Sequence, residues 1–171
     1  MYSSKKANDF INYLEQTDLS SAFQIQEDGD AVLFIREEIH DSARISFMIA
    51  ISDSIKTEIL FFIVDETDPS KRDVLLSVMN QLNKEYILKV YMRESGDIVG
   101  GISYFSTEED FNSDTLLALV SNCIGIVARN VYPRLMQAIW SESWCSSELK
   151  PTKSLRYPNK SSDWQNHEAV V

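Results

Sequence analysis

The chain has 171 residues, of which 44% are hydrophobic and 11% aromatic, enough to bury one core. Its formal net charge of −10 disfavours contact with nucleic-acid phosphates or an anionic membrane. The longest unbroken apolar run, Ile59–Val64, is far shorter than the ~20 residues of a spanning helix. No apolar secretory signal follows the N-terminal residues. We therefore expect a cytoplasmic domain without a nucleic-acid or membrane partner.

The first half predicts one helix and then an antiparallel meander. From Ser4 to about Gln16, apolar residues recur at helical spacing, at Ala7, Phe10, Ile11 and Leu14. The period then changes to two, which predicts four strands joined by short turns, at 23–26, 31–37, 43–51 and 55–64. The last of these strands ends in a continuous apolar run, so we expect a central strand covered on both faces.

The next stretch, Asp68–Phe105, predicts a capped helix followed by a hairpin. Asp68 can cap the first turn, and Pro69 suits the first helical position. The helix then has one apolar stripe, formed by Val74, Leu75, Val78, Met79 and Leu82. Strands over Tyr86–Glu94 and Ile98–Phe105 flank a turn at Ser95-Gly96, and Gly100-Gly101 indicates a bulge or a close approach by another backbone.

A long helix is predicted from a cap at Asn112 or Ser113 toward Trp140. Gly125 in its middle indicates close packing, because glycine costs about 1 kcal/mol against alanine there. Pro133 predicts a kink or break near Asn130–Tyr132. We therefore expect one domain over residues 1–140, which holds 22 acidic and 12 basic residues. Residues 141–171 contain seven serines and balanced charges, typical of a loosely structured tail.

The residues that could carry nucleophilic chemistry are few. Cys123 lies in an apolar helical pattern and Cys145 in the tail, and neither has neighbours at disulfide or zinc-ligand spacing. His40 falls in a predicted turn and His167 in the tail, which favours solvated surface positions. A Cys123–His40 pair is conceivable, but a buried structural cysteine is the preferred interpretation.

Acidic, glycine and methionine patterns also have structural interpretations. Asp28 and Asp30 flank a turn glycine without the twelve-residue calcium pattern, and the cluster Asp65, Glu66 and Asp68 precedes a helix. No phosphate-loop spacing surrounds Gly100-Gly101. The methionines at 48, 79, 92 and 136 suit packing or an adaptable binding surface. We assign no catalytic, cofactor-binding or metal-binding residue and expect no cofactor.

The order helix, four-stranded meander, helix, hairpin and long helix resembles the YbjN family, labelled bacterial sensory transduction regulators. The matching pieces are Leu75–Asn83 ending in Gln81-Leu82-Asn83, the strand Tyr86–Arg93, the turn Ser95-Gly96-Asp97, and Val131-Tyr132-Pro133 leading to Ala138-Ile139-Trp140. The resemblance covers roughly residues 4–140 and omits the tail. It implies an α+β fold with five to six strands and three helices, similar to type III secretion chaperones. Such proteins commonly form homodimers and bind other proteins, and the family offers no catalytic residue.

Three functions remain open at this point. The leading hypothesis is a non-enzymatic, dimeric protein-binding module of the cytoplasm with a regulatory or chaperone-like role. An enzyme would most plausibly be a small metal-dependent hydrolase using acidic residues from several strands. A third alternative is a sensor domain that binds a small apolar ligand between the sheet and the long helix.

Overall fold

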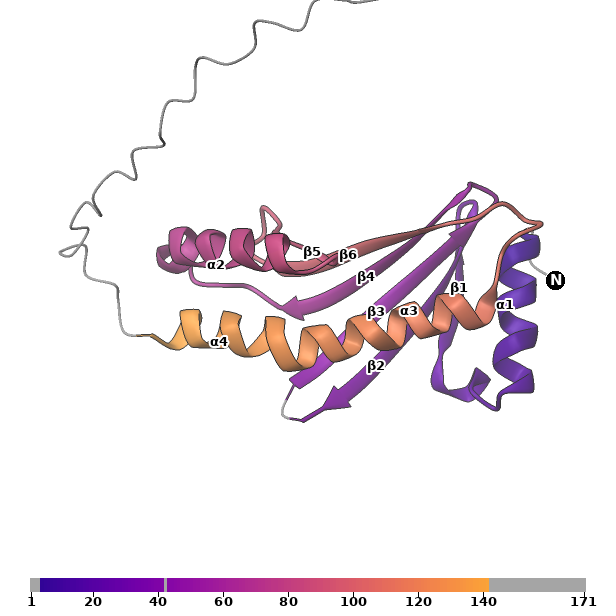
Figure 1. Ribbon diagram of the computed structural model, residues 1–171, viewed down its shortest axis with the longest axis horizontal. Coiled ribbons are helices and arrows are strands. Elements are labelled where there is room, and N and C mark those ends of the chain that lie inside the picture. The colour runs from indigo at the N-terminus through magenta and orange to yellow at the C-terminus, as the bar shows by residue number, and fades with distance from the viewer. Residues whose placement is uncertain (1–3, 42, 142–171) are drawn as a thin grey trace, which may run out of the picture. The chain divides into compact units, whose positions relative to one another are not determined.

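Six antiparallel strands form one sheet, in the order β1-β2-β3-β4-β6-β5. The structure is a computed structural model that describes residues 4–41 and 43–141. Figure 1 shows the long C-terminal helix running across the strands of the meander. The elements in chain order are α1 (Lys5–Gln16), η1 (Ser20–Ala22), β1 (Gln24–Asp28), β2 (Ala31–His40), β3 (Ala43–Ser52), β4 (Lys56–Val64), η2 (Pro69–Lys71), α2 (Arg72–Glu85), β5 (Lys89–Met92), β6 (Ile98–Phe105), α3 (Ser113–Ile126), η3 (Val127–Val131) and α4 (Tyr132–Trp140).

The helices pack on one face of this sheet and form a single core with it. On β3 the predicted alternation is confirmed, because the residues that face the helices are at most 2% exposed: Ala43, Ile45, Phe47, Ile49 and Ile51. Phe10 of α1 packs edge-to-face on Phe34 of β2 with ring centroids 4.9 Å apart. Leu75 of α2 and Leu116 of α3 join the same core cluster.

The predicted helix after Asp68 begins with a short 3₁₀ turn. The Asp68 carboxylate accepts a hydrogen bond from the Ser70 N–H at 2.8 Å, which is the expected cap. This bond from the Ser70 backbone lowers the pKa of Asp68 below its usual value. The apolar stripe of α2 is buried as predicted, with Leu75, Met79 and Leu82 inside the core.

Asn83, near the end of α2, attaches this helix to the edge strand β5. Its side-chain amide donates to the Val90 carbonyl at 2.8 Å, and its side-chain oxygen accepts from the Val90 N–H at 2.7 Å. Because β5 has β6 as its strand neighbour on one side only, these two bonds take the place of a second strand for Val90.

The long helix changes its hydrogen-bond pattern where proline was expected to disturb it. Asn112 caps α3 by accepting from the Thr115 N–H at 2.7 Å. The π-helical turn η3 precedes Pro133, and the Tyr132 N–H bonds to the Val127 carbonyl. Pro133 therefore disturbs the helix through a π-helical turn but does not break it, because the helix continues directly through α4.

Close packing at Gly125 is also confirmed, and it comes from the same helix. A Cβ added to Gly125 would lie 2.7 Å from a guanidinium nitrogen of Arg129. The Arg129 Nε–H also donates to the Gly125 carbonyl at 3.3 Å. The glycine thus leaves room for Arg129 to fold back along the helix.

The prediction that β4 is covered on both faces is wrong, although the strand is central in the sheet. Ile59 and Phe61 are fully buried under the helices, whereas Leu60 and Phe62 on the other face are only half-buried. No helix of the described residues covers that second face. The continuous apolar run in β4 therefore reflects a strand with one covered and one uncovered apolar face. A strand covered on both faces has the same sequence pattern.

The hairpin differs from its prediction in length and in the role of its glycines. Strand β5 spans only Lys89–Met92, and the chain bends at Ile87 and Leu88. Pairing is regular at Gly100 and Gly101, so the predicted bulge is wrong there; the register shift lies on β4 between Phe62 and Val64. The close approach to Gly100 comes from the side chains of Leu88 and Ile63, 3.2 and 3.3 Å from an added Cβ.

The described residues cluster as one compact unit that ends at Ser141. Apart from Ser141, the predicted tail, 141–171, lies outside the described residues. The helix Ser113–Trp140, 28 residues long, is by length and composition apolar enough to cross a membrane, a test that core helices of soluble proteins also pass. Polar residues such as Ser121 and Asn122 interrupt this segment, so it contains no long unbroken apolar run.

Candidate functional site

The face of the sheet opposite the helices is a candidate binding surface, which we call the open face. Pairing places Ile35 beside Met48 and Met48 beside Leu60 across three central strands. This register puts the three half-buried side chains side by side on the same face of the sheet. Apolar side chains in adjacent strands, exposed in this way, are typical of a surface that another protein covers.

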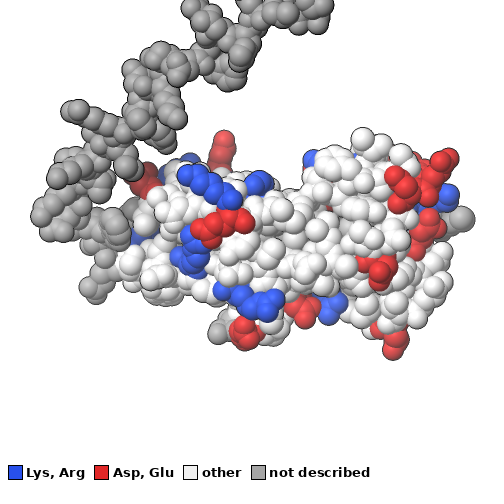
Figure 2. Space-filling view, viewed as in Figure 1, with Lys and Arg blue, Asp and Glu red and all other residues white. Residues whose placement is uncertain are grey.

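Charged side chains lie over and around this apolar surface. The Arg93 guanidinium lies 5.5 Å from the centre of the Phe62 ring, a cation–π contact. Arg44 forms an ion pair with Glu37. On the side of the molecule seen in Figure 2, acidic side chains lie at both ends of the body, whereas most of the basic ones lie toward the end that carries α2 and α4.

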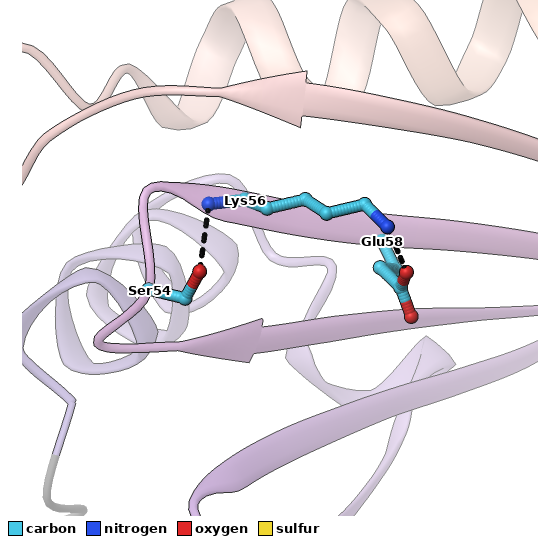
Figure 3. A network of polar contacts seen from close by, with 3 residues as sticks. All are labelled: Ser54, Lys56 and Glu58. Atoms are coloured by element: carbon cyan, nitrogen blue, oxygen red, sulfur yellow. Dashed lines mark hydrogen bonds and ion pairs between the residues drawn. The ribbon is translucent and has the colours of Figure 1, made fainter.

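The start of β4 holds its own charges in a local network, drawn in Figure 3. The Lys56 N–H donates to the Ser54 hydroxyl at 3.2 Å, and the Lys56 ammonium forms an ion pair with Glu58. Both side chains are about half exposed, so the pair contributes at most about 1 kcal/mol. Its effect is to leave this end of the open face with little net charge.

A groove of about 350 Å³ opens beside this pair, between β4, β6 and the bend before β5. Its apolar walls include Ile87, Tyr91 and Phe105, whose side chains are 64%, 43% and 65% exposed. The ammonium of Lys89 is held away as a donor to the carbonyls of Asn83 and Tyr86, at 2.8 and 3.2 Å. The groove is therefore a surface for apolar contact with satisfied charges at its rim.

The residues considered for nucleophilic chemistry do not form a reactive pair in this structure. Cys123 is fully buried in the core, where burial raises the pKa of its thiol to about 11, so the thiol stays protonated near neutral pH. His40 is half-buried at the end of β2. Cys145 and His167 lie outside the described residues.

The acidic clusters occupy the turns expected for them. Gly29, between Asp28 and Asp30, has φ 59° in the turn from β1 to β2, and both aspartates are exposed. Asp65 and Glu66 are exposed in the loop before the Asp68 cap. Within residues 4–41 and 43–141, no three His, Cys, Asp or Glu side chains lie close enough to hold a metal ion.

The methionines at 48, 79, 92 and 136 divide between core and surface. Met79 is 2% exposed in the core, and Met92 is partly buried and packs against the core. Met136 is half-buried on α4. Met48, at the centre of the open face, fits the adaptable binding surface that the sequence left as an alternative.

The burial of Lys6 of α1 was not predicted from the sequence, yet this residue is only 1% exposed. Its ammonium donates to the Ser54 carbonyl in the turn between β3 and β4. Burial lowers the pKa of Lys6, an effect that the nearby Asp53, Glu108 and Asp110 partly offset. The available signal was its position four residues before Phe10, on the stripe that faces the core.

One solved structure with a similar fold is the crystal structure of the ExsC–ExsE complex. The match has a TM-score of 0.53 and covers 83% of this chain and 100% of the matched chain, at 10% sequence identity. No family model and no curated protein matches the chain. Identity this low shows a shared fold alone. The predicted fold class is confirmed: an α+β fold shared with a chain of that complex, with an antiparallel sheet packed by an N-terminal, a middle and a long C-terminal helix.

Proposed function

We propose that this chain is a non-enzymatic protein-binding module of the bacterial cytoplasm, with a regulatory or chaperone-like role. In this proposal it is related to the YbjN proteins and acts as a homodimer. The observation that carries the proposal is the open face, where Ile35, Met48 and Leu60 form an apolar strip that no described helix covers. The similar fold of a chain in the ExsC–ExsE complex, a complex of two proteins, supports it.

Contact of this apolar strip with water is unfavourable in free energy. Removing apolar surface from water contributes about 25 cal/mol per Å², so covering these partly exposed side chains stabilises a complex by at most a few kcal/mol before its entropic costs. Met48 lies in the middle of the strip, where a partner's surface would cover it first. A flexible thioether at that position can adapt to more than one partner.

The test compares two variants that place the same charge on different surfaces. Met48→Lys puts an ammonium at the centre of the open face, whereas Met136→Lys puts it on α4, and both methionines are half-buried. Wild type and the Met136→Lys control should retain their proteins in native co-purification. Met48→Lys should lose them while keeping its circular dichroism spectrum. Equal retention by both variants would reject the open face as the binding surface.

Self-association is tested separately by sedimentation velocity. A wild-type chain that sediments as a dimer at micromolar concentration supports the dimeric part of the proposal. A strictly monomeric chain that retains no protein in native co-purification would overturn the proposed function as a whole.

A further inference from the structure

A pocket of about 390 Å³ lies where the turn between β2 and β3 meets the π-helical turn η3. Its volume is in the range of small-molecule sites in proteins. The residues that line it are Asp41 and Ala43 from the strand turn, and Ala128, Arg129, Tyr132 and Pro133 from the helix. The pocket therefore lies between the sheet and the long helix, where the sequence left a small-ligand site as an alternative.

One positive and one negative side chain line this pocket without pairing with each other. Arg129 and Asp41 form no ion pair within residues 4–41 and 43–141. The Arg129 Nε–H donates to the Gly125 carbonyl at 3.3 Å, which holds the side chain along the helix. The outer nitrogens of its guanidinium have no hydrogen-bond partner among the described residues. They can therefore donate to the carboxylate of a ligand, the group that a guanidinium fits best.

Pro133 leaves the helix one donor short beside the pocket. It has no N–H, so a carbonyl four or five residues before it receives no bond from this position. The Tyr132 N–H bonds to the Val127 carbonyl. The carbonyl that lacks a donor therefore belongs to Ala128 or Arg129, and both residues line the pocket. This backbone oxygen is a further acceptor for a cationic group of a ligand.

The floor of the pocket is small and apolar. Ala43 and Ala128 are only 2% and 4% exposed and belong to the core cluster. Apart from Arg129 and Asp41, no charged side chain lines the pocket in the described part of the chain. A fitting ligand thus carries a carboxylate, an ammonium and an apolar body on one small molecule, which are the groups of an apolar α-amino acid.

We propose that this pocket binds a free α-amino acid with an apolar side chain of about the size of leucine. Its carboxylate pairs with Arg129, its ammonium with Asp41, and its side chain lies on the alanine floor. A peptide terminus carries only one of these two charges on its end residue, so the chemistry favours the free amino acid. The proposal goes beyond the proposed protein-binding function and does not depend on it, since the open-face strip does not line the pocket.

The probe is L-leucine, compared with two analogues that each lack one charged group. 3-Methylbutylamine has no carboxylate, and 4-methylpentanoate has no ammonium. Isothermal titration of the full chain should give a Kd below about 1 mM for leucine. Each analogue should bind at least about tenfold more weakly, because one charged residue of the pocket is left without its partner. Amide chemical shifts should change at Ala43 and Ala128 but not at Met48.

Matched variants assign each charge to its residue. Arg129→Gln should remove the advantage of leucine over 3-methylbutylamine, and Asp41→Asn should remove its advantage over 4-methylpentanoate. Asparagine suits position 41, where φ is 54°, because it adopts left-handed backbone more readily than most residues. Arg134→Gln is the control on the same helix, since Arg134 pairs with Glu85 outside the pocket. It should bind leucine within about twofold of wild type.

Three results would overturn the amino-acid site. These are no leucine binding by wild type at about 10 mM, binding of either analogue as tight as that of leucine, or equal weakening by Arg129→Gln and Arg134→Gln in chains with the wild-type circular dichroism spectrum. Met48→Lys should bind leucine as wild type does, even where it loses its captured proteins. The failure of either proposal is therefore visible without the other.

Discussion

The attachment of β5 to α2 through Asn83 makes a quantitative prediction about stability. Asn83→Ala removes both hydrogen bonds to Val90 and leaves its N–H and C=O without those partners, although Val90 is only 2% exposed. An unsatisfied buried polar group costs about 1–3 kcal/mol. Since the space left by the amide admits some water, we expect Asn83→Ala to lower the free energy of unfolding by about 2–4 kcal/mol. For a domain of this size, that corresponds to a fall in Tm of roughly 10 °C.

The assay is chemical and thermal denaturation, with amide hydrogen exchange at Val90 as the local readout. Asn12→Ala, on the exposed side of α1, is the matched control and should change stability by less than about 0.5 kcal/mol. Asn83→Asp keeps the acceptor for the Val90 N–H but loses the donor to its carbonyl, so it should fall between wild type and Asn83→Ala. A loss below about 0.5 kcal/mol in Asn83→Ala, with unchanged exchange at Val90, would refute the reasoning.

Three further predictions concern the core. Gly100→Ala should destabilise the fold by about 1–3 kcal/mol, because its Cβ would press on Leu88 and Ile63, whereas Gly101→Ala, whose Cβ meets only ordinary contacts, should be tolerated in denaturant titrations. In a Cys145→Ser background, Cys123 should resist iodoacetamide at pH 8 until the chain is unfolded, since burial raises its thiol pKa to about 11; rapid labelling of the native protein would contradict this. The pKa of Lys6 is lowered on folding, so just below pH 10.5 the unfolded chain binds more protons than the folded chain. Wild type should therefore gain stability relative to Lys6→Met as the pH rises toward that value. An opposite slope in pH-dependent unfolding would contradict this.

Local periodicity predicted most of the fold because the core-facing residues follow it closely. The stripes of α1 and α2, the alternation in β3 and the disturbance before Pro133 are all found where the pattern placed them. The length of β5 was overestimated because the alternation from Tyr86 continues through a bend. Leu88 keeps its inward orientation at that bend although it leaves the ladder, so the side-chain pattern did not mark where pairing ends.

The open face shows why sequence alone could not locate a binding surface. Leu60 and Phe62 are as apolar as Ile59 and Phe61, so periodicity could not tell an uncovered face from a covered one. The burial of Lys6 was not predicted, because lysine is rarely buried and its partner, the Ser54 carbonyl, is distant in sequence.

The central claim is that the open face is the surface covered by a protein partner. Hydroxyl-radical footprinting of the natively purified complex tests it directly, because methionine side chains oxidise readily and report their own exposure. The account predicts that Met48 is protected in the complex relative to the isolated chain, while Met136 on α4 oxidises equally in both. Protection of Met136 with unchanged oxidation of Met48 would contradict it and place the partner on the helical side.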